Sequence, residues 1–264
     1  MGALDLLVAS RNHQQLVILA CNDDGIQSEG LYRLVQALEA LDRVIVVAPD
    51  RERSAVSHAL TLDRPLRADE VRHGWFAVDG TPTDCVNLAI NGLLSEAPRL
   101  VVSGINRGAN LGDDITYSGT VSAAMEAVLL GIPAVAFSQV GKVAFDYGVA
   151  AGFARALVGR LFENERTLPR DMLLNVNVPE STPVHGYAIT RQGKRRYGDA
   201  VVEKTDPRGR KYYWIGGDQL DFDDEPGTDF SAIRRSEISV TPLHLDLTNY
   251  EAMTPVAELK VPWP

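Results

Sequence analysis

Two adjacent carboxylates, Asp23 and Asp24, follow directly after the apolar run from Leu16 to Ala20. Such a run is typical of a buried parallel strand that stops at a polar turn. Paired carboxylates at a buried strand end repel each other, and a divalent cation or a shared proton relieves the repulsion. Because Asn-Asp-Asp-Gly is also good turn chemistry, these residues alone leave a metal site and a solvated turn as open alternatives.

A second group that could do chemistry is Ser118-Gly119-Thr120, which opens a predicted helix directly after a glycine- and asparagine-rich loop. Backbone N–H groups and the positive end of the helix dipole make such a terminus an anion site, and nearby hydroxyls can add donors. The alternative is simple N-capping by Ser118 or Thr120. A metal beside an anion site indicates phosphoryl chemistry, with hydrolysis by a metal-activated water as the default reaction.

Other polar side chains follow two further predicted strands. Ser54 and His58 lie in the loop after the second strand, and Ser103, Asn106 and Asn110 lie at and after the third. Ligands of doubly wound sheets bind at the carboxyl ends of the strands, so these groups are expected beside the two carboxylates. Each also has an ordinary interpretation as a turn, a strand end or a packed histidine. A ligand set of carboxylate, amide and hydroxyl oxygens favours Mg²⁺ or Mn²⁺ over Zn²⁺.

The elements that position these groups alternate between buried strands and amphipathic helices. Strands are predicted at residues 16–20, 44–48, 100–103, 134–137 and 173–178, and helices at residues 28–41, 82–94, 121–129 and 145–162. A strand or hairpin is expected within residues 60–78, and a loop over residues 104–118. This order predicts an α/β fold: a three-layer, Rossmann-like, doubly wound and mostly parallel sheet.

Three segments are predicted along the chain. Residues 1–15 form an N-terminal extension, residues 16–183 form the Rossmann-like catalytic core, and residues 184–264 form a β-rich hairpin and C-terminal tail. Asp206-Pro207-Arg208-Gly209 is the expected hairpin tip, because these residue types favour tight turns. The three segments together are expected to make one domain with an appendage.

The 264 residues carry 35 acidic and 26 basic side chains, which is a formal net charge of −9. This surplus opposes binding to nucleic-acid polymers and to anionic membranes. It also argues against an anionic substrate, unless a cation bound by Asp23 and Asp24 reverses the sign locally. Two cysteines without metal-type spacing, and the lack of a recognisable signal peptide or membrane anchor, favour the cytoplasm.

Several common catalytic motifs are missing from the sequence. It has no GxGxxG fingerprint, and neither Gly141-Lys142 nor Gly193-Lys194 has the upstream glycine and following Ser or Thr of a Walker A loop. HExxH and GxSxG are also absent. Rossmann-type redox chemistry, P-loop ATP hydrolysis, zinc proteolysis and serine-esterase chemistry are therefore disfavoured.

Five motifs in one order resemble those of the SurE survival-protein family, whose members are metal-dependent 5'-nucleotidases. They are Asn22-Asp23-Asp24-Gly25, Ala48-Pro49 through Arg53-Ser54-Ala55, Gly80-Thr81-Pro82-Thr83-Asp84-Cys85, Ser103-Gly104-Ile105-Asn106-Arg107-Gly108 and Tyr117-Ser118-Gly119-Thr120-Val121. The resemblance extends from Leu16 to Thr241-Pro242-Leu243. It departs at Cys21, where the family usually has Thr or Ser, and at the N-terminal fifteen residues.

The resemblance implies a cytoplasmic hydrolase that releases phosphate from nucleoside 5'-monophosphates, with side activity on 3'-nucleotides or polyphosphate. It also implies one divalent ion per subunit, Mg²⁺ or Mn²⁺, with Asp23 and Asp24 as catalytic residues. Carried over by position, the metal ligands are Asp23, Asp24, Ser54 and Asn106, and the phosphate ligands are Asn110, Ser118, Gly119 and Thr120. Homodimers or homotetramers would form through a hairpin near Arg195 to Trp214 and the tail after Thr241.

Two non-enzymatic alternatives stay open. A phosphorylation-sensing receiver module also has an acidic pair after its first strand, but its phospho-acceptor would have to be Asp69 or Asp79, and neither follows a clear buried run. A nucleotide-binding regulator without turnover would use the same motifs. Stoichiometric labelling by a small phospho-donor would indicate a receiver, whereas multiple turnovers would indicate a hydrolase.

Overall fold

The computed structural model describes residues 17–141, 145–164, 169–180, 182–196, 201–215, 221–223 and 225–262. The predicted N-terminal extension, residues 1–15, lies outside these ranges. Within them, no helix is both long enough and apolar enough to cross a membrane. Both cysteines, Cys21 and Cys85, are buried as free thiols.

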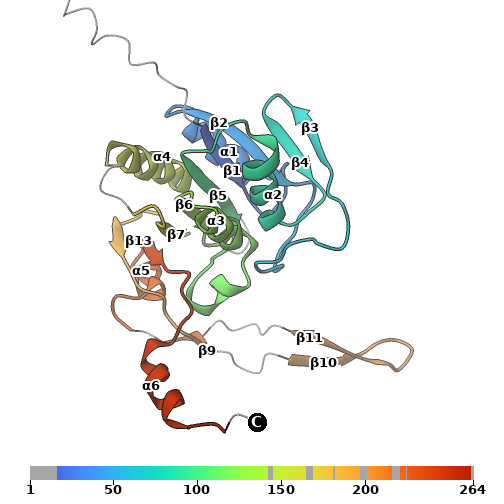
Figure 1. Cartoon of the computed structure of the whole chain (residues 1–264), viewed down its shortest axis with the longest axis vertical. Helices are drawn as coiled ribbons and strands as arrows, with labels where there is room; N and C mark the ends of the chain where they lie inside the picture. Colours follow the sequence, from blue (N-terminus) through green and yellow to red (C-terminus); the bar gives the residue numbers. More distant parts are fainter. Residues whose placement is uncertain are drawn as a thin grey trace, which may run out of the picture.

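A nine-stranded sheet forms the centre of the protein (Figure 1), in the order β3-β4-β2-β1-β5-β6-β7-β13-β8. Its strands are β1 (Val17–Cys21), β2 (Arg43–Pro49), β3 (Ala68–Arg72), β4 (Trp75–Val78), β5 (Leu100–Arg107), β6 (Ala134–Gln139), β7 (Leu173–Val178), β8 (Tyr187–Ile189) and β13 (Ile238–Leu243). The six strands from β4 to β7 in this order run parallel, whereas β3 and β13 run antiparallel to β4 and β7. The mostly parallel sheet is confirmed, and β8 and β13, from beyond residue 183, belong to it.

The order of the strands reverses beside β1. Strands β2 and β4 lie on one side of β1, whereas β5, β6 and β7 lie on the other. In doubly wound sheets such a switch point opens a crevice at the carboxyl ends of the strands that flank it. Since β1 and β5 pair in parallel, the crevice brings the loop after Cys21 beside the end of β5.

Helices cover both faces of the sheet and complete three layers. They are α1 (Glu29–Leu38), α2 (Pro82–Leu88), α3 (Gly119–Leu129), α4 (Gly148–Glu163), α5 (Asp229–Arg234) and α6 (Tyr250–Glu258). A π-helical turn, η1 (Ala89–Leu93), extends α2, and a 3₁₀ helix, η2 (Gly112–Thr116), precedes α3. Helix α1 packs with α4 on one face, and α2 packs with α3 on the other, which confirms the predicted three-layer arrangement.

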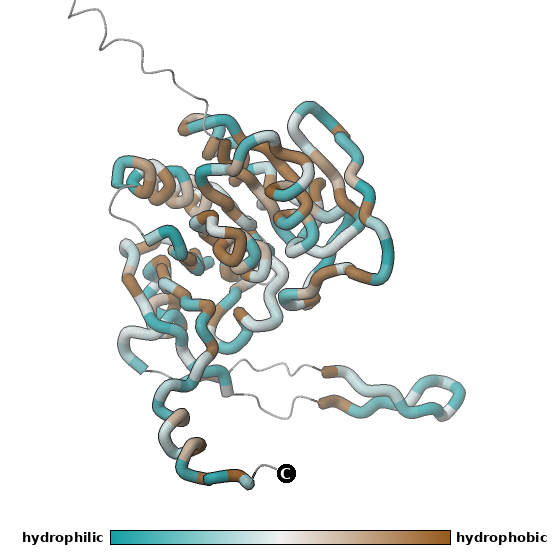
Figure 2. The backbone as a smooth tube through the Cα atoms, viewed as in Figure 1, coloured by the Kyte–Doolittle hydropathy of each residue, from teal (hydrophilic) through white to brown (hydrophobic). Residues whose placement is uncertain are grey.

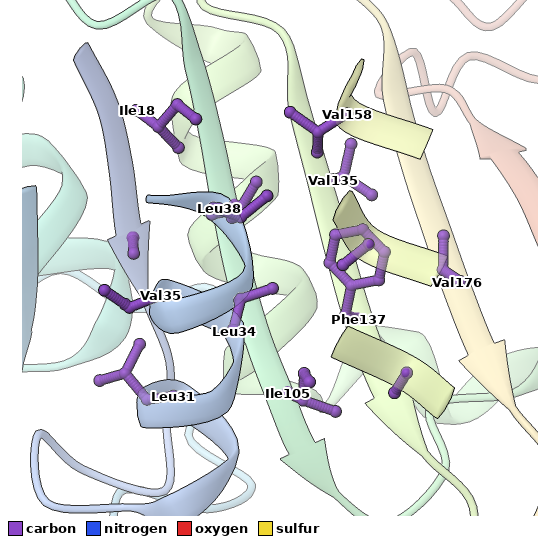
Figure 3. Packing of buried hydrophobic residues seen from close by; sticks show 14 of the residues in the cluster. Ile18, Leu31, Leu34, Val35, Leu38, Ile105, Val135, Phe137, Val158 and Val176 are labelled. Atoms are coloured by element: carbon purple, nitrogen blue, oxygen red, sulfur yellow. The ribbon is translucent and has the colours of Figure 1, made fainter. Parts of the chain in front are cut away.

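Helix α1 shows how the sequence pattern produces this packing. Ser28 is its N-cap, and the Ser28 side chain accepts a hydrogen bond from the Leu31 amide. Leu31, Leu34, Val35 and Leu38 recur at helical spacing, and all four are buried. Figure 3 shows this face of the helix lying against the strands of the sheet. The packing fixes α1 over the switch point.

The predicted loop over residues 104–118 is wrong in part, because β5 continues to Arg107 and η2 follows. The register between β5 and β6 shifts just before Asn106, and this β-bulge lets the strand continue. Gly104 makes the bulge possible: its φ is +128°, and a Cβ there would lie 2.3 Å from the carbonyl oxygen of Phe137.

The helix predicted from residue 145 begins instead at Gly148, because the side chain of Tyr147 packs into the core before the helix starts.

The appendage is a β-hairpin that projects from the body of the protein (Figure 1). It consists of β10 (Val201–Thr205) and β11 (Lys211–Ile215), and a short antiparallel pair, β9 (Arg195–Arg196) with β12 (Asp221–Phe222), lies near its base. The predicted turn is confirmed at its tip, where Asp206 Oδ1 accepts hydrogen bonds from the amides of Arg208 and Arg210. Figure 2 shows that hydrophobic residues lie on this projecting element.

Candidate metal and phosphate site

The first predicted carboxylate lies in the crevice at the switch point. Asp23 follows β1, and only 5% of it is exposed. The Thr120 hydroxyl donates a hydrogen bond to Asp23 Oδ1, and the Thr120 amide also hydrogen-bonds this carboxylate. Gly119 permits the approach, because a Cβ there would lie 2.7 Å from the Asp23 Cβ. The N-terminus of α3 is thus held against Asp23.

The second carboxylate, Asp24, lines an open cavity. Its Oδ2 accepts a hydrogen bond of 3.0 Å from the backbone amide of Arg107, at the end of β5. The cavity has a volume of about 680 Å³, and Ser54 lines it together with Asp24. Residues after β1, β2 and β5 therefore meet at one cavity, as the order of the strands predicts.

Burial makes the two carboxylates difficult to ionise. It raises the pKa of Asp23 to about 6; the Thr120 hydrogen bonds act against this rise, and the charge of Asp24 adds to it. Burial also raises the pKa of Asp24, against the effect of the Arg107 amide and with a contribution from the charge of Glu52. A bound divalent cation would offset both the cost of burying the two negative charges and the repulsion between them.

Ser54 reaches the site from the loop after β2. The backbone joins this loop to the loop after β1, because the Arg53 amide donates a hydrogen bond to the Asp23 carbonyl oxygen at 2.7 Å. The Ser54 hydroxyl donates to Glu52 Oε1 at 2.8 Å. A hydroxyl that donates its proton keeps lone pairs for a cation, so this arrangement suits the predicted ligand role.

Asn106 lies on β5, one residue before the amide that binds Asp24. Its Nδ2 donates a hydrogen bond to the Gly108 carbonyl oxygen at 3.0 Å, so Oδ1 is the side-chain atom suited to a cation. Helix α1 lies close behind, because a Cβ on Gly30 would come within 2.0 Å of the Ile105 carbonyl oxygen. This packing fixes the bulge from which Asn106 extends.

Asn110 lies in a buried polar cluster under the loop after β5. Its amide donates a hydrogen bond to Asn177 Oδ1 at 2.8 Å, and its Nδ2 donates to Ser138 Oγ at 2.8 Å. Its carbonyl oxygen accepts hydrogen bonds from Asn175 and Asn177. These bonds attach the loop to β6 and β7, while the role of Asn110 in phosphate binding stays a prediction.

Ser118 caps helix α3, as the simpler interpretation of this helix start predicts. Its Oγ accepts a hydrogen bond from the Val121 amide at 3.1 Å. The same helix start binds a carboxylate, Asp23, through Thr120, so its N-terminus does attract negative charge. Phosphate binding by Ser118, Gly119 and Thr120 stays a prediction.

The cavity also contains residues that the sequence pattern did not single out as site residues. They are Glu29, Glu52, Arg107, Phe145 and Tyr147. These residues come from four segments of the chain that only the fold brings together, and of the five only Glu52 and Arg107 lie inside the motifs. Burial raises the pKa of Tyr147, and the charge of Asp24 adds to this rise. The phenol is therefore a hydrogen-bond donor at neutral pH.

The donor set at the crevice consists of oxygen atoms. In the part of the chain that the structure describes, no three histidine, cysteine or acidic side chains lie together in an arrangement that could hold a metal ion. The candidate ligands are instead two carboxylates, one hydroxyl and one amide oxygen. This chemistry fits Mg²⁺ or Mn²⁺.

The fold and the site together define a doubly wound α/β protein with oxygen donors and a helix N-terminus at its switch point, an arrangement suited to phosphate chemistry. The model of the family described as Survival protein SurE matches residues 18–199. The chain therefore belongs to the SurE family, as its motifs predict. This membership overturns the receiver-like alternative. Its candidate acceptors lie at one edge of the sheet, where Asp69 is part of β3 and Asp79 follows β4.

Named relatives are similar to the chain over most of its length. A protein from Syntrophotalea carbinolica named 5'-nucleotidase SurE is 60% identical over 239 residues, which cover 90% of this chain and 94% of that protein. The protein of the same name from Geobacter sulfurreducens is 59% identical over 240 residues, which cover 90% and 91%. The crystal structure of the SurE protein from Aquifex aeolicus matches with a TM-score of 0.83 at 44% identity, covering 92% of this chain and 99% of that chain.

Proposed function

We propose that the protein is a divalent-metal-dependent 5'-nucleotidase, which hydrolyses nucleoside 5'-monophosphates to a nucleoside and phosphate. The observation that carries this proposal is the contact of Asp23 with the N-terminus of α3, because it places a cation-binding carboxylate beside an anion-binding helix start. Relatives that are 60% and 59% identical bear the name 5'-nucleotidase SurE, which supports the same reaction.

One divalent cation per subunit, Mg²⁺ or Mn²⁺, would be held by Asp23, Asp24, Ser54 and Asn106. The buried, mutually repelling carboxylates support this assignment, because their charge is costly without a cation. When bound, the cation neutralises the carboxylates, polarises the phosphate and lowers the pKa of the attacking water. Asp23 and Asp24 are the proposed catalytic residues.

Hydrogen bonds within the chain fix both proposed catalytic side chains. Thr120 holds Asp23, and the Arg107 amide holds Asp24. Because these partners belong to the rigid ends of α3 and β5, the carboxylates are oriented before a ligand arrives. Such preorganisation avoids a reorganisation cost during the reaction.

The phosphate would be bound by Asn110 and by Ser118-Gly119-Thr120 at the start of α3. Donors fixed at a helix N-terminus stabilise the charge of phosphate oxygens as the P–O bond breaks. The hydrogen bonds of Asn110 to β6 and β7 support this proposal, since they fix its loop against these two strands.

The projecting hairpin supports assembly into homodimers or homotetramers. Tyr213, Trp214 and Ile215 of β11 are 56%, 62% and 89% exposed, and contiguous exposed apolar residues mark interaction surfaces. Helix α6 also has no buried residue. We assign the hairpin of β10 and β11 and the tail after β13 to oligomerisation. The predicted boundary at residue 183 does not separate the two parts, because β8 and β13 lie in the core sheet with residues 16–183. We place the protein in the cytoplasm, where its two buried free thiols would stay reduced.

The test is phosphate release from purine and pyrimidine nucleoside 5'-monophosphates by the purified protein. We expect many turnovers per subunit with Mg²⁺ or Mn²⁺, none in EDTA, and a loss of about 10²- to 10³-fold in Asp24→Asn, a size typical of removing one preorganised charged group. Asp171→Asn is the matched control, because Asp171 is exposed and precedes the amino end of β7, whereas the candidate site lies at the carboxyl ends of the strands. Full activity in EDTA contradicts the metal assignment, and nucleotide binding without turnover supports the regulatory alternative.

A further inference from the structure

The cavity beside Asp24 has a second wall that the proposed hydrolysis leaves without a role. Arg107, Phe145 and Tyr147, which form this wall, line the same cavity as Asp24 and Ser54, two candidate cation ligands. The volume of about 680 Å³ is far more than one phosphate group needs, and it lies in the range of pockets that hold whole small molecules. The remaining space is available to the rest of the substrate.

This second wall consists of flat, polarisable groups. The rings of Phe145 and Tyr147 are stacked, with centroids 6.0 Å apart and an interplanar angle of 15°. The guanidinium carbon of Arg107 lies 5.3 Å from the centroid of the Phe145 ring. The side chain of Tyr147 is buried, whereas that of Phe145 is half-buried. Guanidinium planes and aromatic rings both bind the faces of planar heterocycles.

The wall is attached to the same rigid elements as the candidate catalytic groups. The backbone amide of Arg107 binds Asp24, which ties this residue to the reacting end of the cavity. Tyr147 packs against helix α1, where a Cβ on Gly30 would lie 3.3 Å from its ring. A ligand that spans the cavity would therefore meet two surfaces whose separation is set by the fold.

The charges of the cavity oppose a second anionic group. Asp24, Glu29 and Glu52 line it, and Arg107 is the basic residue among the described lining residues. A nucleobase is uncharged at neutral pH, so the carboxylates of the cavity do not repel it. The cavity therefore fits an uncharged planar group that is attached to a single phosphate.

We propose that Arg107 and Phe145 form the surface on which the nucleobase of the substrate packs. This inference rests on the proposed nucleotidase function and adds the specificity-determining residues for the nucleoside half. Every nucleobase has a π-face, so the wall tolerates all of them and distinguishes nucleotides from phosphate esters that lack a base.

The test compares kcat/KM of wild type and Phe145→Ala for three substrates: a purine and a pyrimidine nucleoside 5'-monophosphate, and ribose 5-phosphate. We expect Phe145→Ala to lose about 5- to 100-fold on both nucleotides, mainly through KM, which is the range for removing one aromatic stacking partner. Ribose 5-phosphate should be hydrolysed as well as by wild type. Phe145→Leu, which keeps the apolar contact with the core, should show the same selective loss, and Phe145→Tyr should restore nucleotide turnover.

The control is Tyr32→Ala, because Tyr32 lies in a neighbouring groove with Arg72 and Trp75. Its activity on all three substrates should match wild type. An equal loss on ribose 5-phosphate in the Phe145 variants, or no loss on nucleotides, overturns the proposal. A selective loss in Tyr32→Ala alone also overturns it and places the base in the neighbouring groove.

Failure of the proposed function has a different signature. In that case wild type hydrolyses none of the three substrates, and equilibrium titration with the same nucleotide and with ribose 5-phosphate still tests the wall. Weaker binding of the nucleotide alone to Phe145→Leu supports the inference, and unchanged binding overturns it.

Discussion

The crevice at the switch point and the projecting hairpin differ in what their side chains contact. In the crevice, buried polar groups are matched by the chain itself, as Asp23 is by Thr120 and Asp24 by the Arg107 amide. On the hairpin, Trp214 and Ile215 remain exposed in the single chain. The first region is organised by one copy of the chain, and the second has an apolar surface that a second copy would cover.

From this difference we predict that the proposed chemistry and the proposed assembly are separable in this protein. All proposed cation ligands come from the core sheet or from the loops that it holds, whereas the hairpin lies outside the sheet. Changes in the crevice should therefore alter turnover without altering assembly. Changes in the hairpin should alter assembly without altering turnover. The predictions below test this division, beginning with the largest expected effect.

The largest effect is expected from Gly119→Ala, which inserts a methyl group against Asp23. Because the added Cβ would lie 2.7 Å from the Asp23 Cβ, one of the two segments must move. A displacement of about 1 Å in a catalytic group can lower turnover by about 10²-fold, and we expect a loss of at least this size. The measurement is the steady-state rate of phosphate release together with the subunit mass in solution, which should not change.

The matched control for this substitution is Gly152→Ala, in helix α4. A Cβ at Gly152 meets nothing within 4 Å, so the change should leave turnover intact and raise stability by up to about 1 kcal/mol through helix propensity. Equal turnover in the two variants would mean that the contact between α3 and Asp23 has no bearing on the reaction.

The hairpin is tested by Trp214→Ser. Tryptophan side chains that become buried in an interface often contribute much of its binding energy. We therefore expect self-association to weaken by about 30-fold or more, with little change in the rate of phosphate release per subunit. Sedimentation across a concentration series measures the first quantity, and phosphate release measures the second. Tyr187→Ser serves as control, since Tyr187 is also exposed but belongs to β8 of the main sheet. A monomeric variant that loses turnover would contradict the division between crevice and hairpin.

A smaller effect is expected from Ser118→Ala in the crevice. Loss of the N-cap should cost about 1 kcal/mol of stability, and inhibition by inorganic phosphate should weaken more than the affinity for Mg²⁺ or Mn²⁺. Thr228→Ala removes the equivalent cap from α5 and controls for the loss of stability alone. Equal losses of phosphate and metal affinity would speak against the proposed separation of ligand roles.

The smallest effect concerns Asp229, which joins the two regions. Its carboxylate accepts hydrogen bonds from the amides of Gly112, the first residue of η2, and Gly193, near the base of the hairpin. Burial raises the pKa of Asp229 above its ordinary value, against the effect of these amides. The folded state therefore favours the protonated form, and this contribution to stability is present at low pH and lost as the pH rises through the folded pKa.

Chemical denaturation across a pH series should reveal this contribution. The free energy of unfolding of wild type should fall, relative to that of Asp229→Asn, as the pH rises above 3.8, the ordinary aspartate pKa. Asn cannot titrate, so the variant lacks this slope. A constant difference between wild type and variant at all pH values would show that folding does not shift the pKa of Asp229.

The sequence by itself determined the strands, most of the helices and the loops that carry the candidate ligands. Apolar runs, Ser28 and Ser118 as N-caps, and the hairpin turn at Asp206 are local signals, and the structure confirms them. Because local spacing also sets the order of strands and helices, the doubly wound sheet and its ligand-binding edge follow from the sequence.

Only the tertiary structure decided how those loops meet. The pairing of Thr120 with Asp23, the bulge at Gly104 that prolongs β5, and the cavity wall of Arg107 and Phe145 depend on contacts between residues far apart in the chain. The strand order specifies an edge, but side-chain packing and register place individual atoms there, and these arise from the whole core rather than from any one segment.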